Sequence, residues 1–259
     1  MLLTFLSNQM KQQLQYRSNF LFSILGSFIY IYIRICVWKA LLPYDHSGMA
    51  TLSEMVTYTL MVEFCYHLTQ FNTSSILRDQ VRTGNIAISL IRPVSLCYYN
   101  FQIEFTNNMM YFLFSGIPVF IAAAFIWGIT APQIWQFLLF VISTILGGAI
   151  MFFFDYAIGL CSFWLKNGIS MGMLVNGLFS IFSGSSIPLW FYPDWLANIC
   201  RFLPFRLVSF EPISIYLGRY NGMQAVQILL LQIVWLMLCI GLKECIWKKV
   251  QKAVVSQGG

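Results

Sequence analysis

The chain has 259 residues and a net charge of +6, with 59% hydrophobic and only 9% charged residues. A soluble domain carries about 25% charged residues, so this composition excludes a soluble protein. The apolar runs are continuous rather than alternating, and several reach the ~20 residues that a membrane-spanning helix needs, which argues against a β-barrel. The basic residues form no face with interleaved aromatic residues, so nucleic-acid binding is not expected either.

The sequence carries no motif for enzyme or metal chemistry. It has no GxxxxGK[ST] phosphate-binding loop, and no glycine is followed by lysine. Gly184-Ser185 does not belong to a GxSxG nucleophile motif. The seven cysteines form no CxxC pair, and the two histidines form no HExxH motif, so we expect no metal site and no cofactor in this chain.

Residues 1–18 are predicted to form an amphipathic helix in the membrane interface, since Leu3, Leu6, Met10 and Leu14 recur at helical spacing among polar residues. A frayed tail is the alternative. No cleavable signal peptide is evident.

The first two predicted spans cover residues 19–42 and 53–71, and the second is the less apolar. Glu63 lies in the second span and marks either a transport path or a structural ion pair with Arg34 of the first span.

The longest polar interruption is residues 74–95, SSILRDQVRTGNIAISLIRPVS. Residues 72–75 offer amino-terminal helix caps, Gly84 suits a left-handed helix end, and Pro93 closes a second short helix. We therefore predict two short helices on the membrane surface. Three arginines there can meet either an acidic protein partner or anionic lipid headgroups: Arg78, Arg82 and Arg92.

Spans three and four are predicted over residues 105–127 and 134–165, with a kink at Pro118 in the former. The longer span contains Gly147-Gly148, which suits close helix approach. It also contains Asp155, an intramembrane acid that lies either at a subunit interface or transport path, or in a hydrogen-bonded helix contact.

Span five is predicted over residues 169–182 and span six over residues 223–242. Between them, residues 183–205 are apolar but broken by three prolines, which predicts a re-entrant or interfacial hairpin with tryptophans at the membrane interface.

The expected fold is therefore an all-α polytopic membrane protein with six transmembrane helices in one domain, residues 1–259. With both termini inside, ten of the 15 Lys and Arg residues lie on the cytosolic side, as the positive-inside rule requires.

Two segments resemble a known family. VRTGNIAISLIRPVS (81–95) and, more specifically, SGSSIPLWFYPDWLANICRFLPFRLVSFEPISIYLG (183–218) are similar to segments of six-span permeases of the type 2 ABC exporter superfamily. The resemblance covers essentially the whole chain.

This resemblance implies a bacterial plasma-membrane permease that pairs with a second permease and with two cytosolic ATPase subunits, which bind ATP and Mg²⁺. It implies export of an amphipathic, peptide, drug or lipid-like cargo. Residues 74–95 would couple the permease to the ATPase, through Arg78, Arg82, Gly84, Ile88, Arg92 and Pro93. Residues 183–205 would form an outer gate, with Pro188, Trp190, Pro193, Asp194 and Trp195.

Two alternatives remain from the sequence alone. One is an ion-driven secondary transporter that uses Glu63 and Asp155, although no internal repeat is evident. The other is a non-transporting membrane scaffold or immunity protein.

Overall fold

The computed structural model describes residues 17–44, 48–91, 93–164 and 171–257. These residues form helices joined by short turns, with no strand among them, which confirms the all-α class. Three predicted features lie outside the described residues: most of the interfacial helix at 1–18, Arg92, and the end of span four with the start of span five at 165–170.

The helices follow the chain in this order: α2 (Arg17–Leu41), η1 (Leu42–Tyr44), α3 (Leu52–Thr69), α4 (Thr73–Thr83), α5 (Ile86–Ile91), α6 (Leu96–Tyr111), the π-helical turn η2 (Phe112–Gly116), α7 (Ile117–Trp127), α8 (Ile134–Leu160), η3 (Cys161–Phe163), α9 (Met171–Phe182), η4 (Leu189–Phe191), α10 (Asp194–Arg201), η5 (Pro204–Leu207), α11 (Phe210–Tyr216) and α12 (Gly222–Gln257).

Four helical stretches are long and apolar enough to cross a membrane: Ser18–Leu41, Leu96–Trp127, Ile134–Phe163 and Gly222–Lys252. Helices α3 and α9 occupy the places of predicted spans two and five but are not among these four. Helix α9 has only 12 described residues, and α3 carries acidic residues, including Glu63. Helix α3 is nevertheless enclosed by its neighbours, since every residue from Met55 to Val62 is buried.

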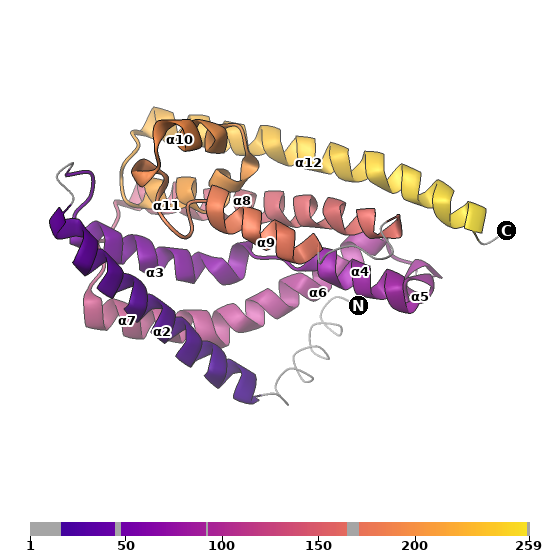
Figure 1. Ribbon diagram of the computed structural model, residues 1–259, viewed down its shortest axis with the longest axis horizontal. Helices are drawn as coiled ribbons and strands as arrows, with labels where there is room; N and C mark the ends of the chain where they lie inside the picture. The colour runs from indigo at the N-terminus through magenta and orange to yellow at the C-terminus, as the bar shows by residue number, and fades with distance from the viewer. Residues whose placement is uncertain (1–16, 45–47, 92, 165–170, 258–259) are drawn as a thin grey trace.

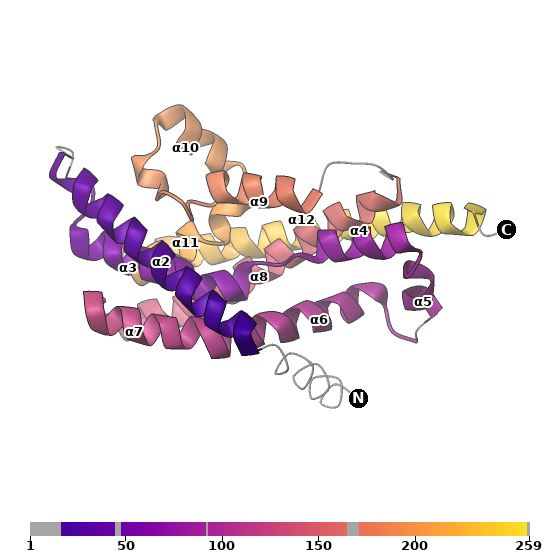
Figure 2. The same cartoon turned by 60° about the horizontal axis from the view of Figure 1, so that its bottom comes forward.

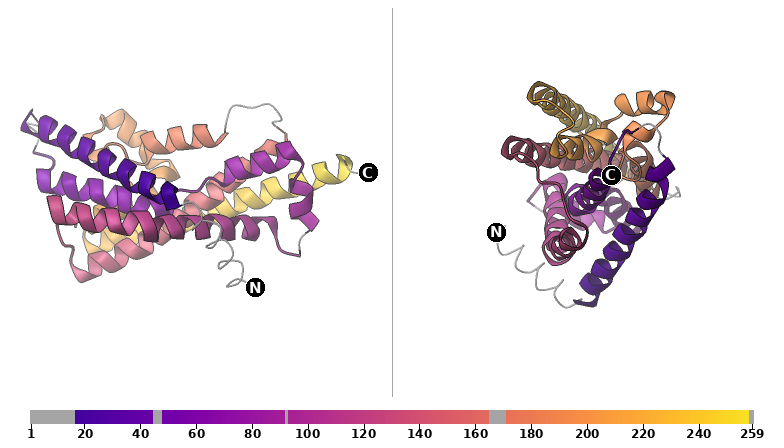
Figure 3. Two further views of the ribbon diagram at one scale, coloured as in Figure 1. Left: turned by 90° about the horizontal axis from the view of Figure 1, so that it is seen from below. Right: turned by 90° about the vertical axis from the view of Figure 1, so that its left-hand side faces the viewer.

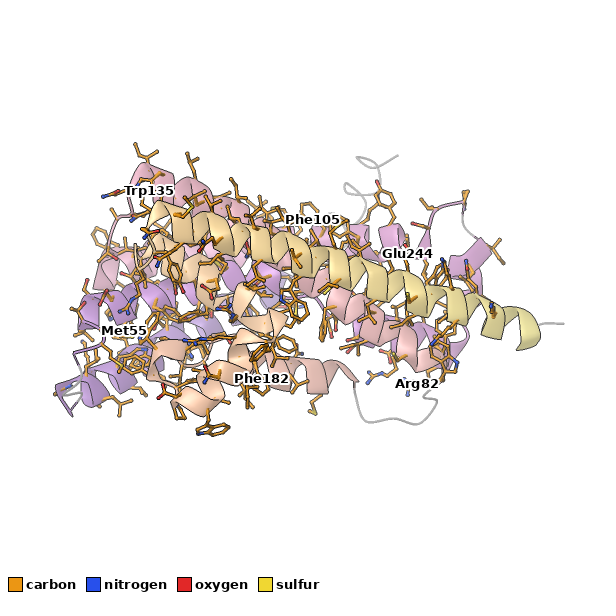
Figure 4. The ribbon with its side chains drawn as sticks, turned by 90° about the horizontal axis from the view of Figure 1, so that it is seen from above. Met55, Arg82, Phe105, Trp135, Phe182 and Glu244 are labelled. Carbon is orange, nitrogen blue, oxygen red and sulfur yellow. The ribbon has the colours of Figure 1, made fainter. Side chains whose placement is uncertain are left out.

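The helices run roughly along the long axis of the molecule, with α2 lying obliquely across the others (Figures 1 and 3). Helices α4 and α5 lie at the same end as the carboxyl end of α12, whereas α10 and α11 lie toward the opposite end (Figures 1 and 2). Among labelled side chains, Arg82 and Glu244 mark the first end, and Met55 and Trp135 mark the second (Figure 4). We call these the α4–α5 end and the α10–α11 end.

Helix α8 is the centre of the fold and packs against α12, α4, α11 and α3. Its Gly147 lies against the backbone of Val208, and Gly148 lies against the backbone carbonyl of Leu68, so that an added Cβ would lie 3.0 and 2.9 Å away respectively. The predicted role of this glycine pair in close helix approach is confirmed. Gln232 of α12 completes the contact, because its buried amide donates to the carbonyl oxygens of Ser143 and Leu207.

Two predicted boundaries are wrong. Span three begins at Leu96 rather than Phe105, because Ser95 caps the helix by accepting a hydrogen bond from the Tyr98 amide at 3.3 Å. Its predicted irregularity near Pro118 takes the form of the π-helical turn η2. Helix α12 continues past Leu242 to Gln257, since its lysine-rich end keeps an apolar side that includes the fully buried Val250.

Candidate functional site

The segment formed by α4 and α5 has the predicted two-helix structure. Helix α4 ends at Gly84, which adopts a left-handed conformation with φ of 75° and donates its amide to the Val81 carbonyl. A residue with a side chain rarely adopts this φ, so glycine makes the break between the two helices possible. Gly84 therefore has the conformational role that the sequence predicts.

Helix α4 is held against α8 at very short range. Leu77 is completely buried in the core, and a Cβ added at Gly159 of α8 would lie 2.8 Å from the Leu77 side chain and from the Ser74 Cα. Real Cβ atoms do not approach other atoms so closely, so the contact requires a glycine at position 159. The sequence analysis did not single out this residue.

The amino terminus of α4 is capped by carboxylates from two other helices. The Ser74 amide donates to Asp155 of α8 at 2.9 Å, and the Asn72 amide donates to Glu104 of α6 at 2.8 Å. Both acceptors are buried, and negative charge is favourable beside the free N–H groups of a helix amino terminus.

This arrangement corrects one prediction and decides between the two alternatives for another residue. Asn72 occupies the N-cap position of α4, but its side chain makes no capping hydrogen bond. The Asp155 carboxylate participates in a hydrogen-bonded helix contact, which is one of the two alternatives for this residue, and it faces the α4 amide within the described chain.

The side of α4 and α5 away from α8 exposes both charge and apolar surface. Arg82 is exposed and lies 4.0 Å from Asp79, whereas Arg78 is partly buried at 3.5 Å from the same carboxylate. The side chains of Ile88 and Ile91 are 61% and 84% exposed. Pro93 is also exposed, while Arg92 lies outside the described residues. Figure 4 shows Arg82 at this end of the molecule.

A pocket of about 370 Å³ adjoins the start of α4, and we call it the Glu104 pocket. Its lining comes from α2, α3, α6 and α9 and from the loop before α4. The polar residues that matter below are His67, Gln70, Asn72, Glu104 and Asn108, and two tyrosines also contribute, Tyr66 and Tyr111. Glu104 thus lines the pocket and also accepts the Asn72 amide.

A second pocket, of about 440 Å³, continues along α2, α3 and α9, and we call it the Glu63 pocket. The two pockets share Tyr66, Gln70 and Asn176 as lining residues. The predicted ion pair between Glu63 and Arg34 is not among the ion pairs of the described residues, because Arg34 instead donates to the Ser186 carbonyl. Glu63 lines the pocket and hydrogen-bonds to the Ser27 side chain, and Arg34 acts on it only from beyond ion-pair distance.

The predicted hairpin residues divide into an anchored part and an exposed part. Pro188 is buried, and Trp190 packs edge-on against Tyr58 with a ring-centroid distance of 5.4 Å. The Arg219 guanidinium lies 3.9 Å from the Trp190 ring and 3.4 Å from the Glu54 carboxylate. These contacts fix η4 against the start of α3.

The exposed part is the beginning of α10. Pro193 occupies its N-cap position, Asp194 lies in its first turn, and the Trp195 side chain is 65% exposed. The five hairpin residues therefore do not form one cluster, and they lie toward the end of the molecule opposite α4 and α5 (Figure 2).

A family model described as ABC-2 family transporter protein matches residues 21–258. None of the curated proteins compared with the chain matches it.

Proposed function

The chain belongs to the ABC-2 family of transporter proteins, and from this premise we propose that it is the permease subunit of an ATP-driven exporter. Membership of the family supports the permease role and implies association with ATPase subunits in general. In our proposal ATP and Mg²⁺ are bound by a separate ATPase chain, because this chain has no phosphate-binding loop. The permease itself is then not an enzyme.

The α4–α5 segment is the proposed coupling site for the ATPase. The exposed Ile88 and Ile91 offer apolar contacts to a groove on the partner, and Arg82 offers a charge to an acidic rim. The observation that carries the proposal is the double capping of α4 by Asp155 and Glu104. A force applied to α4 would be transmitted through these hydrogen bonds directly to α8 and α6.

The remaining architecture is proposed as follows. Helices α3 and α9 complete a set of six spans, both chain ends face the cytosol, and residues 183–205 form an outer re-entrant hairpin. Two permeases, identical or homologous, assemble with two ATPases in a bacterial plasma membrane. The cargo is amphipathic, peptide, drug or lipid-like and leaves the cell.

Purification of the tagged chain from its native membranes, followed by an ATPase assay, tests this function. We expect an ATP-hydrolysing subunit to co-purify with the wild type and to be lost or uncoupled in Arg82→Glu. The matched control is Arg201→Glu, which reverses an exposed charge on α10 at the opposite end and should leave co-purification unchanged. If no ATPase co-purifies with the wild type, the proposal fails.

The same preparation tests the ion-driven alternative. Glu63 lines a pocket, where its side chain hydrogen-bonds to Ser27 and no ion pair within 4.0 Å joins it to a basic side chain of the described residues, and a proton-coupled carrier would need such an accessible carboxylate. Transport that follows the proton gradient, persists without ATP and is abolished in Glu63→Gln would replace the ATP-driven function with this one.

A further inference from the structure

The two connected pockets share a chemical character that restricts what they can bind. Their lining residues include two carboxylates, Glu63 and Glu104, and no lysine or arginine among the described residues. Three tyrosine rings also line them, Tyr30, Tyr66 and Tyr111, and the Arg34 guanidinium lies 4.9 Å from the centre of the Tyr30 ring. In the Glu104 pocket, which has no lysine or arginine in its lining, the carboxylate and the Tyr66 and Tyr111 rings together favour a cation over an anion.

Three side chains of the Glu104 pocket have an atom that can accept a hydrogen bond from a ligand. The Nε2 atom of His67 is buried and has no hydrogen-bond partner among the described residues. Asn108 uses its Nδ2 to donate to the Gln70 carbonyl at 2.6 Å, which leaves its oxygen for a ligand. Glu104 is only 6% exposed and adds a carboxylate. A group with several N–H donors satisfies such a set best.

We propose that the Glu104 pocket binds the primary ammonium headgroup of an amphipathic cargo, whose apolar part extends along the Glu63 pocket. The inference rests on the permease function proposed above and specifies its cargo class. The Glu63 pocket has the surface for the apolar part, because Val62, Phe179 and Tyr30 line it.

Glu104 connects the bound headgroup to the coupling segment, because it can contact both. The same carboxylate accepts the Asn72 amide at the start of α4, so an ammonium group that binds Glu104 shares an acceptor with α4. An ammonium group in the pocket therefore alters the hydrogen bond between Glu104 and the Asn72 amide, at the start of the segment on which the ATPase would act.

The test measures binding to the intact chain without any ATPase. Tritiated octylamine is titrated onto tagged chain in phosphatidylcholine nanodiscs by scintillation proximity, with empty nanodiscs as the blank. We expect saturable binding that unlabelled octylamine abolishes and octanesulfonate does not. Absence of saturable binding, or equal competition by octanesulfonate, overturns the inference.

Two variants locate the site. In Glu104→Gln the amide oxygen still accepts from Asn72, so the fold is kept while the charge is lost, and we expect at least a tenfold weaker octylamine affinity. In His67→Phe an acceptor is lost but the ring beside Tyr111 is kept, so octylamine should bind severalfold more weakly and octyltrimethylammonium should be unaffected. Glu54→Gln at the α10–α11 end is the matched control and should bind like the wild type. Wild-type affinity in Glu104→Gln would refute the assignment.

The source of the amine is distinguished by the lipid. If phosphatidylethanolamine nanodiscs lower the octylamine affinity, the lipid headgroup itself occupies the pocket, and an unchanged affinity assigns the pocket to a free amine. Binding without a co-purifying ATPase would leave the site in place and refute the ATP-driven function. A co-purifying ATPase without octylamine binding would support the ATP-driven function and refute the ammonium site.

Discussion

The backbone amide of Ser74, at the start of α4, donates a 2.9 Å hydrogen bond to the carboxylate of Asp155, which lies near the carboxyl end of the long helix α8. The two residues are 81 positions apart in the sequence, and both are almost completely buried. A surface segment is therefore connected to the central helix of the bundle by a charge-assisted hydrogen bond, which is about twice as strong as a neutral one.

Replacing Asp155 by alanine should destabilise the protein. The Ser74 amide would stay buried without a partner, which costs about 1–3 kcal/mol. Asp155→Asn keeps a hydrogen-bond acceptor and should lose less stability than Asp155→Ala. Thermal unfolding in detergent, followed by tryptophan fluorescence, measures the difference. An Asp155→Ala variant that melts with the wild type would show that this hydrogen bond does not hold α4 in place.

A methyl group at Gly159 should push α4 away from α8. The added Cβ would lie 2.8 Å from the Ser74 Cα, and overpacking of this kind costs about 1–3 kcal/mol. We expect Gly159→Ala to lower the melting temperature and to reduce stimulation of the ATPase. Gly241→Ala is the control, since nothing lies within 4 Å of its Cβ position and alanine favours helix. Equal melting of the two variants would contradict the close contact.

Removing the Arg219 side chain should loosen the anchored part of the hairpin. Arg219→Ala loses both the Trp190 ring contact and the Glu54 ion pair, so the buried Cys200 of α10 should react faster with maleimide. Peptide mass spectrometry gives the rate at this cysteine alone. Arg201→Ala, which loses only a side-chain hydrogen bond to Asn198, serves for comparison. If Cys200 reacts equally slowly in both variants, Arg219 does not anchor the hairpin.

The proposed orientation predicts which exposed positions can be labelled from outside the cell. With the two exposed cysteines, Cys36 and Cys245, replaced by serine, Arg201→Cys should react with a membrane-impermeant maleimide on intact cells. Lys248→Cys should react only after the membrane is opened. The reverse pattern would place the α4–α5 end outside and exclude a cytosolic coupling role.

Features that depend on residues close together in the sequence can be predicted from it. The end of α4 at Gly84 and the close approach at Gly147-Gly148 both follow from local backbone and side-chain size. The partners of α4 could not be predicted, because Asp155 and Glu104 come from helices that only the tertiary fold brings together. The nearby polar residues at 72–75 predict side-chain caps, whereas carboxylates from α6 and α8 cap α4 in the structure.

Glu104 does not emerge as a candidate from the sequence. The third span is predicted to begin at Phe105, so Glu104 falls one residue outside it and is not an intramembrane acid in that prediction. The polar side chains of residues 98–104 hid the true beginning of the helix at Leu96. A capping signal at Ser95 was present in the sequence and would have indicated the correct boundary.

The length of α12 has a consequence for measuring the motion of the assembly. A helix of 36 residues is ~54 Å long, whereas the hydrocarbon core of a bilayer is ~30 Å thick. Figure 1 shows that this one helix begins at the α10–α11 end and finishes at the α4–α5 end. By length alone, a part of it must lie outside the hydrocarbon core of the membrane. A fluorophore on the exposed Lys252 would magnify any tilt of α12 into a displacement large enough for single-molecule distance measurements.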